Sequence, residues 1–74
     1  MWHNNKTVTR THCKAGSQQA WAIVQDVDPN WLRVKTGSAD GVTNIYMILN
    51  IALSNNRKVD VFVESGMISQ ATLT

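Results

Sequence analysis

The chain has 74 residues, of which 43% are apolar, and Cys13 is its only cysteine, which excludes a disulfide within the chain. Seven Lys and Arg against five Asp and Glu give a net charge of +2, which is too small to require a polyanionic partner. A domain of this size buries only roughly 60% of the surface that its unfolded chain exposes. We therefore expect one domain, residues 1–74, which gains further buried surface from a second copy of itself.

The first half of the chain predicts three strands after a short arm. Residues 1–5 are polar apart from Trp2 and are expected to form a loose arm, or one that docks on a neighbouring subunit. Asp28-Pro29-Asn30 is a tight turn, because Pro presets φ and Asp and Asn tolerate turn geometry, and its shortness predicts a hairpin. The expected strands are residues 6–14, 19–27 and 31–35.

A helix is predicted over residues 40–55. Ser38 or Asp40 can accept hydrogen bonds from the free N–H groups at its start. Asn55 and Asn56 favour its end, since Asn is the usual residue other than Gly in the left-handed conformation that stops a helix.

The last part of the chain predicts two more strands. Residues 58–64 alternate strictly, Ser65 and Gly66 form a turn, and residues 67–73 form the final strand. The order is β-β-β-α-β-β, and the fold class is α+β: a bent antiparallel sheet, or a partly open OB-like barrel, with one helix. The predicted core contains Val8, Trp21, Ile23, Leu32, Val34, Ile45, Leu49, Ala52, Val59, Val61, Val63 and Ile68.

The inward face of the second strand is not settled by its pattern. Trp21 and Ile23 share one face, and Ala20, Ala22 and Val24 share the other. Both faces are apolar, so alternation does not choose between them. The predicted core contains the two larger side chains.

The helix has two apolar faces. One stripe at helical spacing is expected to lie on the sheet. A second patch beside it consists of Met47, Ile48 and Ile51, and residues 41–56 include no charged side chain. A helix that is apolar nearly all round has to be buried nearly all round, so we expect this patch to form the interface of a homo-oligomer. The alternative is that the barrel mouth and the N-terminal arm cover it.

Residues 31–73 resemble a known kind of domain. The helical segment 45–53 has Ala52 in its last turns, and the strand segment 57–63 follows it. This pattern resembles the small OB-like domains of AB5-type bacterial toxin B subunits, especially those of the subtilase-cytotoxin kind, and it is similar to related short uncharacterised bacterial proteins. The resemblance implies an OB-like fold and a tendency to oligomerise. The chain departs from those subunits in its shorter length and its one cysteine, we expect no leader from its first residues, and no sugar-binding residue can be matched.

Trp31, Arg33 and Lys35 are the candidate ligand-binding residues. Side chains alternate along a strand, so these three lie on one face of the third strand. OB-folds use a ring beside cations to stack bases and to contact phosphates. The alternative is a solvated outer face on which Trp31 folds back into a subunit contact.

The first strand could extend this site. Val8, Arg10, His12 and Lys14 are expected to share one of its faces. Cys13 then points to the opposite face, where we expect a small core residue. Because they point apart, Cys13 and His12 cannot act together as nucleophile and base.

No motif indicates catalysis, and we expect no catalytic residue, no metal and no cofactor. Both histidines and the cysteine lie near the N-terminus, which argues against a closed zinc site, and the glycines lack phosphate-loop spacing. The apolar stretch 45–53 is about half as long as a bilayer span requires. We expect no membrane contact, and a cytoplasmic location if Met1 is the native start.

The sequence therefore predicts a small non-enzymatic binding or interaction module that acts as a homo-oligomer. One alternative is an OB-like binder of single-stranded nucleic acid. Another is a glycan or small-molecule site at a subunit junction, lined by Trp and Tyr.

Overall fold

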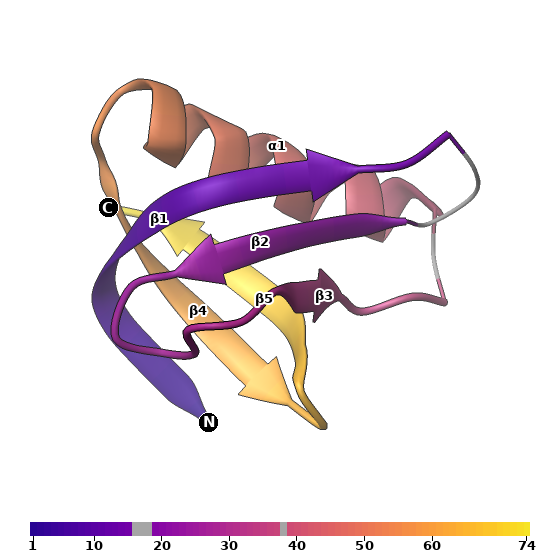
Figure 1. Cartoon of the computed structure of the whole chain (residues 1–74), viewed down its shortest axis with the longest axis horizontal. Coiled ribbons are helices and arrows are strands. Elements are labelled where there is room, and N and C mark those ends of the chain that lie inside the picture. Colours follow the sequence, from indigo (N-terminus) through magenta and orange to yellow (C-terminus); the bar gives the residue numbers. More distant parts are fainter. Residues whose placement is uncertain (16–18, 38) are drawn as a thin grey trace.

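The chain forms a closed five-stranded barrel in this computed structural model, which describes residues 1–15, 19–37 and 39–74. Around the barrel the strands follow the order β1-β2-β3-β5-β4, and β4 pairs with β1 to close it (Figure 1). The predicted α+β order is confirmed, and the architecture is OB-like. The elements are β1 (Trp2–Cys13), β2 (Ala20–Val24), β3 (Leu32–Val34), α1 (Ala39–Ser54), β4 (Lys58–Glu64) and β5 (Met67–Leu73).

The strand pairing differs from a purely antiparallel sheet in one place. β3 and β5 run parallel, with Arg33 opposite Met67 and Val34 opposite Ile68. Parallel neighbours need a long crossover, and α1 and β4 supply it here. The predicted hairpin between β2 and β3 is antiparallel, as expected.

Residues 2–5 begin β1, and Met1 is hydrogen-bonded to β4, so residues 1–5 are not a loose arm. Trp2 lies opposite Phe62 of β4, and the amino group of Met1 donates to the carbonyl oxygen of Val63 at 2.9 Å. The N–H of Val63 donates back to the carbonyl oxygen of Met1 at 2.9 Å. This correction has a simple cause: the first residues of β1 supply its pairing with β4, and this pairing closes the barrel. β1 pairs with β4 through its first half and with β2 through its second.

A bulge in β1 reverses which of its side chains face the interior. The register shifts between Val8, which lies opposite Val24, and Arg10, which lies opposite Ile23. An extra residue moves every later side chain to the other face, because the facing alternates with period two. Val8 is buried, whereas Arg10 and His12 are exposed. The expected common face for these three residues is therefore wrong.

The turns follow the local sequence. Ser65 and Gly66 have φ values of 52° and 72° and join β4 to β5 directly. Two central residues with positive φ suit the right-handed twist of a tight hairpin. The Asp28 carboxylate accepts a hydrogen bond from the N–H of Asn30 at 2.8 Å, which stabilises the predicted turn at Pro29.

Helix α1 ends at the expected asparagines. Asn56 has a φ of 53°, and the N–H of Arg57 donates to the carbonyl oxygen of Ala52 at 2.8 Å, as in a Schellman motif. The Arg57 guanidinium donates twice to the carbonyl oxygen of Thr74, at 2.9 and 2.7 Å, and so ties the helix end to β5. The predicted cap Ser38 lies outside the described residues.

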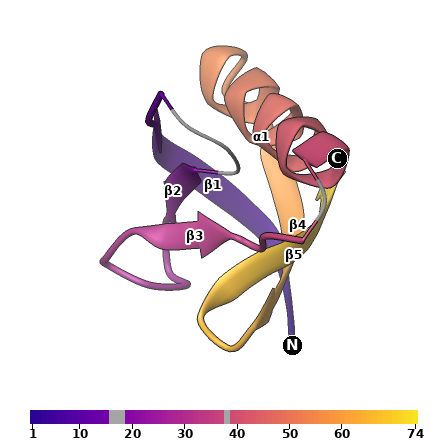
Figure 2. The same cartoon turned by 90° about the vertical axis from the view of Figure 1, so that its right-hand side faces the viewer.

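The helix lies at one end of the barrel, and the N-terminus lies at the other (Figure 2). Its main contacts are with β1 and β5. The Thr11 hydroxyl donates to the side-chain oxygen of Asn50 at 2.6 Å, and the Asn50 amide donates to the carbonyl oxygen of Tyr46 at 2.9 Å. Within the described residues no helix is long and apolar enough to cross a membrane.

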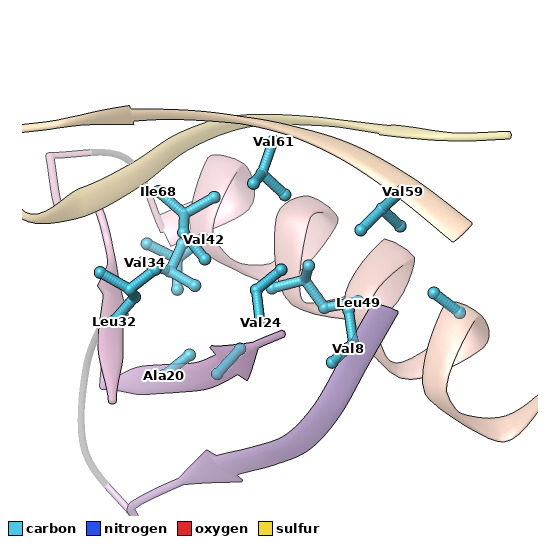
Figure 3. Close-up of a cluster of buried hydrophobic side chains, with 12 residues drawn as sticks. Val8, Ala20, Val24, Leu32, Val34, Val42, Leu49, Val59, Val61 and Ile68 are labelled. Atoms are coloured by element: carbon cyan, nitrogen blue, oxygen red, sulfur yellow. The ribbon is translucent and has the colours of Figure 1, made fainter. Parts of the chain in front are cut away.

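The core lies between the barrel wall and α1, and side chains from all five strands and the helix meet there (Figure 3). Leu49 occupies its centre with no exposed surface. Among the described residues every buried side chain is apolar. They are Val8, Ala20, Ala22, Val24, Leu32, Val34, Val42, Leu49, Ala52, Val59, Val61 and Ile68.

The second strand faces the opposite way from the predicted core. Ala20, Ala22 and Val24 are buried, and Trp21 and Ile23 lie half-buried on the outside. Ala and Val fill these positions of the close-packed interior, and an indole at one of them would overpack it.

Three further core predictions need correction. Ile45 and Val63 pack against the core but remain half-buried, because they lie at its margin. Cys13 lies opposite the buried Ala20 but is exposed, because it is the last residue of β1 and lies beyond the packed interior.

Replacing Leu49 with Ala should lower the free energy of unfolding by about 2–5 kcal/mol, because it leaves a cavity in a packed interior. Leu53→Ala is the matched control: the same change on the same helix, at a side chain that is 36% exposed. Urea denaturation of both variants measures the difference. Equal losses would contradict the assigned helix orientation.

Candidate ligand-binding face

Three aromatic side chains meet on the outside of the barrel. They are Trp21 of β2, Trp31 just before β3, and His12 near the end of β1. The ring centroids of His12 and Trp21 are 5.6 Å apart, and those of His12 and Trp31 are 5.7 Å apart. Both distances are typical of aromatic contacts, so His12 links the two indoles.

The strand register explains this meeting. His12 lies opposite Trp21, Trp21 lies opposite Arg33, and Arg33 lies opposite Met67. Residues opposite one another on one face of a sheet are neighbours, so these side chains form a row across β1, β2, β3 and β5. Trp31 lies beside this row. The ends of β1 and β3 and the beginning of β2 lie at the same side of the barrel, on the right in Figure 1.

Two cations lie beside the Trp21 ring. The Lys14 ammonium nitrogen and the Arg33 guanidinium carbon are each 5.5 Å from the ring centroid. Cations at this distance are attracted by the negative face of the indole. The contacts hold both positive charges near the aromatic residues.

A pocket of about 390 Å³ opens between these side chains, lined by His12, Lys14, Trp21 and Trp31. The described lining residues supply flat rings and a positive charge, and none is a carboxylate or an amide. The pocket therefore suits an anionic ligand that has a flat face.

A second hollow, of about 530 Å³, lies further along the same side of β1 and β2. Ile23 is the next outward residue after Trp21 on β2, and it lines this hollow. The acidic residues Asp26 and Asp28 lie at its rim. The basic and acidic ends of this face are thus separated.

The structure brings together two of the three predicted ligand-binding residues. Trp31 is 44% exposed and lines the pocket, and Arg33 lies beside it over Trp21. Lys35 points elsewhere: its ammonium group pairs with the Glu64 carboxylate at 2.5 Å, at the end of β4. Both side chains are exposed, so this ion pair adds little to stability.

Sequence reasoning missed His12 and Trp21 as site residues. Trp21 had been placed in the core, although the small residues on the other face of β2 could have indicated the reverse. His12 is exposed, and its position beside Trp21 depends on the bulge in β1. Lys14, considered from the sequence as an extension of the site, lines the same pocket.

The predicted interface patch on α1 divides into two parts. Met47 and Ile51 are 56% and 42% exposed, whereas Ile48 is half-buried and packs against the core. The N-terminal residues do not cover this patch, because they pair with β4 at the far end of the barrel. Nothing in the described chain covers Met47 and Ile51 fully.

Comparisons with models of protein families, with curated proteins and with solved structures give no match for this chain. Among the described residues, no three His, Cys, Asp or Glu side chains lie close enough together to hold a metal ion.

Replacing Lys35 with Met should raise the pKa of Glu64. The hydrogen bond from Lys35, and then its positive charge, hold the pKa of this carboxyl below its ordinary value. A lowered pKa stabilises the folded state at neutral pH, and this contribution is lost as the pH falls through the folded-state pKa. NMR titration of the Glu64 carboxyl measures the change, and an unaltered pKa would show that Lys35 does not pair with it in solution.

Proposed function

We propose that this protein is a small non-enzymatic binding module that works as a homo-oligomer and holds its ligand on the outer face of β1, β2 and β3. The observation that carries the proposal is the pocket between Trp21 and Trp31, with His12 and Lys14 in its lining. The outer face of strands 2 and 3, next to the loop between strands 1 and 2, is where OB-folds bind oligonucleotides and oligosaccharides.

The chemistry of the pocket favours binding over catalysis. General-base or nucleophilic catalysis by His12 would need an orienting carboxylate or a nucleophile beside it. The described lining residues offer ring faces and the Lys14 ammonium group instead. Rings and fixed cations recognise a ligand without changing its bonds.

The uncharged helix supports self-association. Met47 and Ile51 lie exposed on a helix whose one charged residue, Asp40, is in the first turn. Two copies of this face can meet without charge repulsion, and each would bury apolar surface that a small domain otherwise leaves in water.

Ile51→Glu should convert the oligomer into a monomer, because it places a charge in an apolar interface. Size-exclusion chromatography with light scattering measures the mass against 8.2 kDa for one chain. Ile51 is a better position than Ile48, whose replacement would also disturb the core. Gln70→Glu, the same charge change at an exposed position of β5, should leave the mass unaltered.

A monomeric wild-type protein, or an Ile51→Glu variant that keeps its oligomeric mass, would contradict the self-association half of the proposal. Equal dissociation by Gln70→Glu would show that net charge, and not the helix face, governs assembly.

The ligand-binding half is tested by NMR of the three indole N–H groups. A panel of single-stranded oligonucleotides, neutral glycans and anionic glycans covers the alternative ligand classes. A ligand at this face should shift the signals of Trp21 and Trp31 and leave that of Trp2 unaltered, because Trp2 contacts Phe62 on another part of the barrel. A panel without any effect on Trp21 and Trp31 would overturn the proposed function.

A further inference from the structure

We infer that the pocket between Trp21 and Trp31 binds an unpaired base of a single-stranded nucleic acid, while Lys14 and Arg33 contact the adjoining phosphates. This inference rests on the proposed function, since it names the ligand class of the same face.

The first step concerns the rings. Trp31 is 44% exposed, and its ring is tilted by 53° to that of His12. Trp21 is half-buried beneath two cations. Trp31 therefore offers the more accessible stacking surface, and Trp21 forms the wall that carries the positive charges. Every base has a flat face, so stacking on Trp31 would tolerate many sequences.

The second step concerns charge. Each base of a nucleic-acid strand is attached to a sugar that has a phosphate on either side. A base stacked on Trp31 therefore brings its own phosphates close to Lys14 and Arg33. Arg10 lies on the same outer side of β1. Three acidic residues have hydrogen-bond partners that are not among the described lining residues of the pocket: Asp28 with Asn30, Asp60 with Asn5, and Glu64 with Lys35.

The third step compares a base with a neutral sugar as the flat ligand. Neutral sugars are recognised through their hydroxyl donors, which need acceptors such as carboxylates and amide oxygens. The described pocket lining contains neither group. Bases inside a duplex are already stacked and cannot lie on Trp31, so the ligand has to be single-stranded.

The arrangement also indicates how the strand lies. The row of His12, Trp21 and Arg33 crosses the β-strands, whereas the hollow further along β1 and β2 is bordered by Asp26 and Asp28. A polyanion avoids those carboxylates by running across the strands, from the β1–β2 side towards β3 and β5.

The test is the fluorescence anisotropy of a labelled oligo(dT) of about 12 nucleotides, a length within the site sizes of OB-folds. Trp31→Ala should weaken its binding roughly 5- to 150-fold, which corresponds to the loss of one stacked base. Trp31→Phe should restore most of the binding, because it restores a ring. Trp2→Ala is the matched control: Trp2 has the same 44% exposure but lies away from the pocket, and its removal should have no effect.

Salt dependence tests the phosphate contacts. For a single-stranded ligand, the slope of log K against log salt should be about −0.7 for each phosphate that the protein contacts. Lys14→Met removes one such contact and should make the slope less steep by about 0.7. Lys35→Met is the control for charge: it also removes one lysine charge, but from a residue that pairs with Glu64 outside the pocket. It should leave the slope unaltered. Equal slopes for the two variants would mean that only net charge attracts the strand, which would overturn the inference.

The outcomes separate the two proposals. Oligonucleotide binding that is lost in Trp31→Ala and kept in Trp2→Ala supports both. An anionic glycan that shifts the Trp21 and Trp31 signals while oligo(dT) does not bind would overturn the nucleic-acid inference and keep the proposed function. If neither ligand class affects these two residues, both proposals fail.

Discussion

Closure of a narrow barrel is the constraint on which the rest of this structure depends. One strand, β1, has to reach both β2 and β4, and it does so by bending at the left-handed Asn5 and at the bulge after Val8. The N–H of Asn5 donates to the Asp60 carboxylate at 2.7 Å and holds the first of these bends against β4. Bulges and bends of this kind allow a strand to turn the corner of a small barrel.

The small interior determines what lies outside. Barrel positions on β2 hold Ala20, Ala22 and Val24, so the aromatic residue between them has to face solvent. The same bulge that closes the barrel turns His12 outward beside Trp21. The candidate ligand-binding face is therefore a direct consequence of how the core is filled.

The small size of the barrel also leaves one side of helix α1 uncovered. Leu49 and Ala52 fill one side of the core, but the barrel beneath is too small to cover the opposite side of α1. Met47 and Ile51 remain in contact with water where most surface helices carry charged residues. A second copy of the chain would supply the missing cover, and this would place assembly and ligand binding on different elements.

Much of the fold could be predicted because it depends on local chemistry. Both ends of the strands β4 and β5, the turn at Ser65 and Gly66, and the helix stop at Asn56 follow from alternation and from residues that tolerate positive φ. The candidate site was only partly predictable. Trp31, just before β3, and Arg33, within it, are two residues apart, so period-two alternation places them on one face.

The order of the elements, their turns and the uncharged outer side of the helix follow from the amino-acid sequence, because each depends on residues close together in the chain. Only the tertiary structure decided that Trp21 points outward, that His12 joins it, and that residues 1–5 pair with β4. These features depend on the volume inside the barrel and on the register of strands far apart in the sequence. Neither the interior volume nor the register between distant strands can be predicted from the alternation of residues within one strand.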